Sequence, residues 1–68
     1  MRNPDRLDRF YKELRNIHKA ELPDWRFGQF MMNFFSYLAG KGIDPFFPEE
    51  SKMIEYLHDY IKEIKGGK

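Results

Sequence analysis

Two breaks that carry proline and glycine, at residues 21–24 and 40–48, divide this 68-residue chain into three segments. Proline disrupts the hydrogen bonding of a helix interior, so no single helix can continue across either break. A chain of this length forms one small domain that buries only about 60% of its unfolded surface. Because it contains no cysteine, its stability must come from apolar packing and not from disulfides or a thiolate metal site.

The first and third segments have the apolar periodicity of amphipathic helices. Leu7, Phe10, Leu14 and Ile17 recur every three or four residues, which predicts a helix over about residues 4–20. In the third segment the apolar residues fall within about a third of a helix circumference, which predicts a helix over about residues 48–64. We therefore expect one helical domain over residues 1–64 and a flexible tail over residues 65–68.

The second segment predicts a helix that packs on two sides. Asp24 is a suitable N-cap, and Gly40 can adopt the left-handed conformation that ends a helix. More than half of the circumference between these residues is apolar or small, so we expect this helix to be the central one. Gly28 would then mark the close approach of another backbone. The predicted fold class is all-α, a small antiparallel three-helix bundle with short connections.

The connection before the third helix has its own pattern. Asp44 is expected to act as a turn acid, because aspartate side chains bond to the backbone two residues on. Pro48 disfavours helical geometry at the residue before it. We therefore expect a tight turn that drops Phe46 or Phe47 onto the core.

The composition excludes several classes of protein. The net charge is only +1, and the longest apolar run is three residues, far short of the roughly 20 that a membrane span requires. The first five residues become charged at once, so we expect no secretory signal, no membrane partner and a cytoplasmic location.

The sequence predicts no enzyme. His18 and His58 are the only histidines, and they fall on different predicted helices. The chain has no cysteine nucleophile, no glycine-rich phosphate loop and no His-Glu-x-x-His pair. We therefore expect no catalytic residue, no metal site and no cofactor.

A basic face on the first helix is one alternative function. It would bind nucleic acid through Arg2, Arg6, Arg9, Lys12, Arg15 and Lys19. Acidic residues are interleaved with these cations at helical spacing, which favours a solvated face of ion pairs instead. Nucleic acid is therefore the less favoured partner.

Protein binding is the favoured hypothesis. The outward face of the second predicted helix carries Trp25, Arg26, Gln29, Met32 and Asn33. Trp and Arg are the residues most enriched at binding hot spots, and Met provides an adaptable contact. Alternatively, Trp25 folds over the preceding turn. The surface would take another protein or a second copy of the chain; a homodimer that holds a small anionic ligand at Arg26 is a further alternative.

The segment Pro23–Gln29, followed by Asn33 and then by residues 44–50, resembles a group of short, uncharacterised bacterial and bacteriophage proteins. Their pattern reads Pro-Asp-x-Arg-(Leu/Phe)-Gly-Gln-Leu, and the resemblance covers about residues 7–64. The chain departs from the pattern at Phe30, where leucine is usual, and at residues 47–48, where a tyrosine is expected. The resemblance implies a phage or prophage context without an established activity. Its pattern positions here are Asp24, Arg26, Gly28, Gln29 and Asn33.

Overall fold

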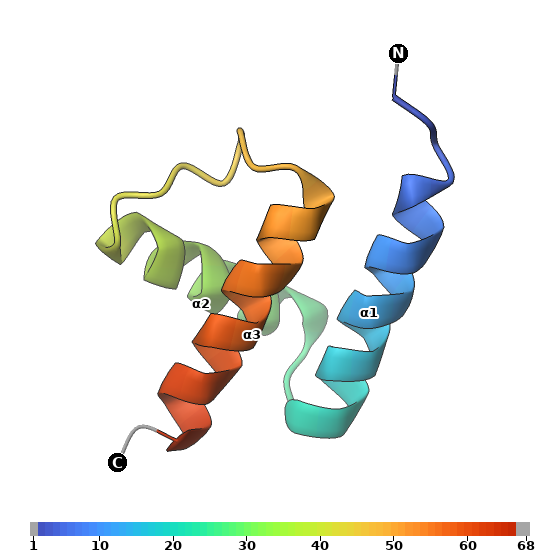
Figure 1. Ribbon diagram of the computed structural model, residues 1–68. Helices are drawn as coiled ribbons and strands as arrows, with labels where there is room; N and C mark the ends of the chain where they lie inside the picture. The colour runs from blue at the N-terminus through green and yellow to red at the C-terminus, as the bar shows by residue number, and fades with distance from the viewer. Residues whose placement is uncertain (1, 67–68) are drawn as a thin grey trace.

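The computed structural model describes residues 2–66, which form three α-helices (Figure 1). Helix α1 spans Arg6–Glu21, α2 spans Phe27–Gly40 and α3 spans Glu50–Gly66. These residues include no β-strand, so the predicted all-α three-helix bundle is confirmed. No helix within the described part of the chain combines the length and the apolar character needed to cross a membrane.

Helices α1 and α3 lie side by side and run in the same direction (Figure 1). One ion pair joins their first residues, with Arg6 Nε 2.9 Å from Glu50 Oε1. A second joins their last turns, with Lys65 Nζ 3.5 Å from Glu21 Oε1. In an antiparallel bundle consecutive helices reverse direction, so the first and third helices are expected to be parallel, as they are here. The connection over residues 41–49 is long enough to return the chain to the end of the bundle where α1 begins.

Helix α2 crosses behind α3, and the main helix–helix contacts are those of α3 with α1 and with α2 (Figure 1). The central helix is thus α3, and the prediction of a central α2 is wrong. The apolar circumference of α2 overstated its burial, because only the side that carries Phe30, Phe34 and Leu38 is buried. One side of α2 is left without a neighbour within the described residues.

Among residues 2–66, seven buried side chains form the core, and all three helices contribute to it. They are Ile17, Leu22, Phe30, Phe34, Leu38, Leu57 and Tyr60. The rings of Phe34 and Tyr60 lie 5.6 Å apart and join α2 to α3. Burial raises the pKa of the Tyr60 hydroxyl. Because the core is small, each of its residues carries a large share of the folding free energy.

The helix ends differ from the predicted ones by one to three residues. α1 begins at Arg6 because residues 3–5 form a turn, in which the Asn3 side chain accepts the Asp5 N–H at 2.9 Å. Helix α3 begins at Glu50 and continues through Gly66. Lys65 and Gly66, expected in a flexible tail, are therefore helical, and residues 67–68 lie outside the described residues.

The end of α2 is fixed by Gly42 and not by Gly40, as the sequence had suggested. Gly42 has the positive φ of 75°, and its N–H donates to Ala39 O at 3.0 Å. The N–H of Ile43 donates to Leu38 O at 2.9 Å. This pair of bonds is a Schellman motif with glycine at its left-handed position.

Candidate protein-binding surface

The structure places the five predicted contact residues in two different settings. Arg26, Gln29, Met32 and Asn33 are exposed, whereas Trp25 is half-buried and packs against the core. Trp25 lies in the loop before α2, and its carbonyl oxygen accepts a hydrogen bond from His18 Nε2 at 2.7 Å. Trp25 therefore closes one end of the bundle, in agreement with the alternative interpretation of this residue.

Gln29 has a structural role that the sequence did not suggest. Its side-chain oxygen accepts the backbone N–H of Arg26 at 2.7 Å, and Arg26 is the residue that precedes α2. This bond satisfies a backbone donor at the helix start, as the third helical residue of a capping box does. Gln29 is therefore not a free recognition side chain in this conformation.

Two of the three predicted structural positions are corrected. Asp24 does not cap α2, because the helix begins three residues later at Phe27 and its N-cap position is Arg26. Gly28 is not a site of close approach within the chain, since a Cβ there would meet no atom within 4 Å. The third, Asp44, does act in a turn: its Oδ1 accepts the Phe46 N–H at 3.0 Å.

Helix α2 contains no charged residue, although 34% of the chain is charged. Its buried residues Phe30, Phe34 and Leu38 lie on one side. On another side, spaced as i, i+4, i+7 and i+11, lie Gly28, Met32, Phe35 and Ala39. Met32 is 73% exposed and Phe35 is 42% exposed. This side of α2 therefore presents apolar atoms to solvent along the whole helix.

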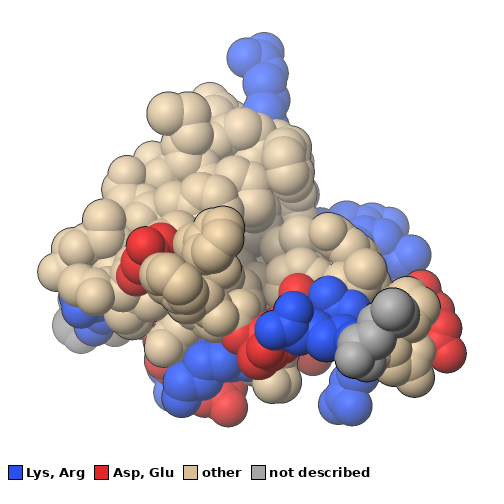
Figure 2. Space-filling view, turned by 90° about the horizontal axis from the view of Figure 1, so that it is seen from above, with Lys and Arg blue, Asp and Glu red and all other residues tan. Residues whose placement is uncertain are grey.

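The loop after α2 adds two exposed aromatic rings. Phe46 is 82% exposed and Phe47 is 74% exposed, so the prediction that one of them reaches the core is wrong. The Asp44 turn holds them outward, and the two rings contact each other edge to face with centroids 5.0 Å apart. Figure 2 shows a broad area without Lys, Arg, Asp or Glu over α2, with one acidic patch beside it.

We use the term apolar face for the exposed apolar or small residues on this side of α2 together with the two exposed rings of the loop. Its members are Gly28, Met32, Phe35, Ala39, Phe46 and Phe47. Met32 was predicted as a contact residue. Sequence reasoning missed Phe35 because it expected α2 to pack on two sides, and it missed the pair Phe46 and Phe47 because it expected one of them to reach the core.

The basic residues of the N-terminal region are partly neutralised. Arg2 Nη2 lies 2.6 Å from Glu49 Oε2, and Arg6 bonds to Glu50. The hydrogen bond from Arg6 holds the pKa of Glu50 below its usual value. These two arginines bind acids of the α3 start, so they are not free for phosphates. Arg9, Lys12, Arg15 and Lys19 remain exposed along α1.

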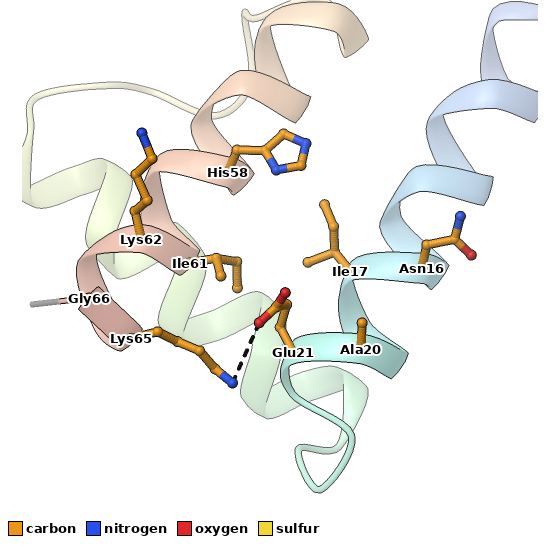
Figure 3. Close-up of a pocket in the computed structure, with 9 residues that line it drawn as sticks. All are labelled: Asn16, Ile17, Ala20, Glu21, His58, Ile61, Lys62, Lys65 and Gly66. Carbon is orange, nitrogen blue, oxygen red and sulfur yellow. Dashed lines mark ion pairs between the residues drawn. The ribbon is translucent and has the colours of Figure 1, made fainter.

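A shallow groove separates the C-terminal halves of α1 and α3 (Figure 3). Ile17 and Ile61 face each other across it, and the ion pair between Lys65 and Glu21 closes its lower end. His58 is exposed at its edge. Within residues 2–66 no group of three or more His, Asp or Glu side chains is placed to hold a metal ion.

Comparisons with protein-family models, with curated proteins and with solved structures find no match. Function is therefore inferred from the geometry of the chain itself, and the apolar face is its most distinctive surface.

Proposed function

We propose that this chain is a non-catalytic protein-binding module of the phage or prophage accessory type, and that it binds its partner through the apolar face. The observation that supports this proposal is the exposure of the large apolar side chains of Met32, Phe35, Phe46 and Phe47, in a chain whose described residues include only seven core side chains. Exposing such side chains to water is unfavourable, so they favour a partner that covers them.

The size of the apolar face fits this role. A fully exposed aromatic or methionine side chain presents roughly 200 Å². At their exposed fractions, Met32, Phe35, Phe46 and Phe47 together present about 500 Å² of apolar surface. The largest apolar patch of a typical monomer is of about this size and is often functional, which supports an interaction site here.

Two of the predicted polar contacts are exposed at or near α2. Arg26 is exposed at the N-terminal end of α2, and Asn33 is exposed next to Met32 in the sequence. An apolar centre with polar residues around it is the common arrangement of protein interfaces. We therefore retain Arg26 and Asn33 as rim contacts and move the centre of the proposed site to Met32.

Site-specific photo-crosslinking tests the proposal. The photoreactive residue p-benzoylphenylalanine replaces Met32, and in a control protein it replaces Tyr11, which is 60% exposed on α1. Both proteins are irradiated in the bacterial cells that produce them. We expect adducts with protein at position 32 and few at position 11. Absence of any adduct at position 32, or equal labelling at both positions, would contradict the proposed function.

A further inference from the structure

We infer that the partner of the apolar face is a second copy of this chain. The two α2 helices pack antiparallel, and the twofold axis lies between the helices at the level midway between positions 33 and 34. This inference rests on the proposed function and names its partner. It is supported by the charge, the residue order and the area of the face.

The first argument is charge. A twofold axis places each surface against its own copy. A charged residue near the axis therefore lies close to the same charge on the second copy, which is repulsive. Helix α2 has no charged residue over residues 27–40. Over these residues its exposed side can face itself without repulsion, although Arg26 comes to the level of Lys41 of the second copy at each end of the helix pair.

The second argument is the order of the residues. An antiparallel pair centred between positions 33 and 34 brings Met32 opposite Phe35 of the second copy, and Gly28 opposite Ala39 of the second copy. The large residues then meet near the axis, where a methionine sulfur packs favourably against an aromatic ring. The small residues meet at the ends, where they allow the two backbones to approach. Every exposed apolar residue of α2 on this side thus has a counterpart of matching size.

Gly28 is compatible with this arrangement. Glycine weakens a helix relative to alanine, and a glycine inside one usually has a conformational or packing reason. Gly28 has no positive φ, and a Cβ there would contact nothing within 4 Å. The chain by itself therefore gives no reason for a glycine at this position. The close approach of a second α2 supplies one.

The third argument is area. Interfaces of stable complexes bury roughly 800 Å² on each partner, and about 65% of a homodimer interface is apolar. The required apolar area is therefore about 500 Å² per chain. The apolar face presents about that area when the Phe46 and Phe47 rings are included. The same rings would extend the contact beyond α2 onto the loop of the second copy.

The test measures self-association by sedimentation equilibrium from micromolar to millimolar concentration. We expect the wild type to dimerise, and Met32→Glu and Phe35→Lys each to weaken dimerisation at least tenfold. Met32→Glu preserves the fold because Met32 is 73% exposed, and circular dichroism checks this. The control Tyr11→Glu adds the same charge on α1 and leaves dimerisation unchanged.

Mixing the two variants tests the register. In a dimer of one Met32→Glu chain and one Phe35→Lys chain, the new carboxylate faces the new ammonium at one contact, while the native Met–Phe contact remains at the other. We expect the mixture to dimerise more tightly than either variant alone. Without this rescue, the proposed antiparallel register is wrong.

The outcomes separate this inference from the proposed function. A wild type that stays monomeric at millimolar concentration, while position 32 crosslinks to a different protein, overturns the dimer and supports the proposed function. A crosslinked product with twice the mass of the chain supports both. A monomer that gives no crosslinked product overturns both.

Discussion

The backbone N–H of Arg26 donates a hydrogen bond to the side-chain oxygen of Gln29 at 2.7 Å, which ties the residue before α2 to its first turn. The first N–H groups of a helix have no partner inside it. Because α2 carries neither an acidic residue in its first turn nor a side-chain cap from its N-cap residue, this bond is its main local stabilisation at that end.

Replacing Gln29 by alanine is expected to destabilise the protein by about 1 kcal/mol, the usual effect of losing a helix cap. Urea unfolding monitored by circular dichroism measures the change. Gln29→Glu retains a side-chain acceptor and adds a negative charge near the positive helix end, so it is expected to preserve stability.

The control Asn33→Ala removes an exposed amide, for which the described residues show no side-chain hydrogen bond. It should change the unfolding free energy by less than about 0.5 kcal/mol. Equal effects at positions 29 and 33 would refute the capping role.

His18 is expected to stabilise the loop between α1 and α2. Its Nε2 lies 2.7 Å from the Trp25 carbonyl oxygen, and its ring packs edge to face on Phe30 with centroids 4.9 Å apart. A carbonyl can only accept, so the Nε2 atom carries the donated proton. His18→Ala leaves that carbonyl without its donor and is expected to cost about 1–3 kcal/mol. His58→Ala, the matched exposed histidine on α3, should cost less than about 0.5 kcal/mol. A small and equal loss for both variants would show that the loop does not depend on this bond.

The two glycines at the end of α2 are expected to respond in opposite ways to alanine. Gly40 is helical and a Cβ there would meet nothing within 4 Å, so Gly40→Ala should stabilise the protein by about 0.5–1 kcal/mol. Gly42 has a φ of 75°, which alanine adopts only with strain, so Gly42→Ala should destabilise it by about 1 kcal/mol. Thermal unfolding of the two variants beside the wild type measures both effects. Stabilisation by Gly42→Ala would contradict the Schellman motif described above.

Local signals in the sequence were sufficient to predict three helices and their approximate limits. Periodicity depends on neighbours three and four residues apart, and the prolines mark the breaks directly. The cap positions were less certain because several residues near each end have suitable chemistry. At the start of α2, both Asp24 and the Arg26–Gln29 pair could supply the cap. At its end, both Gly40 and Gly42 could supply the left-handed residue. Only the backbone geometry distinguishes between them.

The arrangement of the helices could not be predicted in the same way. Periodicity tells which side of a helix is apolar, but not whether a neighbour covers it. The apolar sides of α2 look equivalent in sequence, yet Phe34 is buried and Phe35 is partly exposed. The same limit explains the errors at Phe46 and Phe47, because an aromatic residue in a loop packs inward only when the turn geometry directs it there.

The ion pair between Arg6 and Glu50 should make stability depend on pH in the acidic range. Arg6 Nε lies 2.9 Å from Glu50 Oε1 and joins the starts of the parallel helices α1 and α3. The hydrogen bond from Arg6 lowers the pKa of Glu50 in the folded protein below the ordinary value of 4.5. A folded-state pKa below the unfolded one means that this stabilisation is fully present above pH 4.5 and is lost as the pH falls through the lowered value.

Glu50→Gln is therefore expected to lower the unfolding midpoint at neutral pH and to differ less and less from the wild type as the pH falls below 4.5. Thermal unfolding of both proteins across this range measures the difference. Glu63→Gln is the matched control, because Glu63 is exposed on the same helix and the described residues show no ion pair for it. A Glu50→Gln effect that persists unchanged into strong acid would assign the stabilisation to packing of the side chain and not to its charge. If the pair acts as described, Arg6→Gln should reproduce the pH dependence of Glu50→Gln, because removing either partner returns the remaining group to solvent.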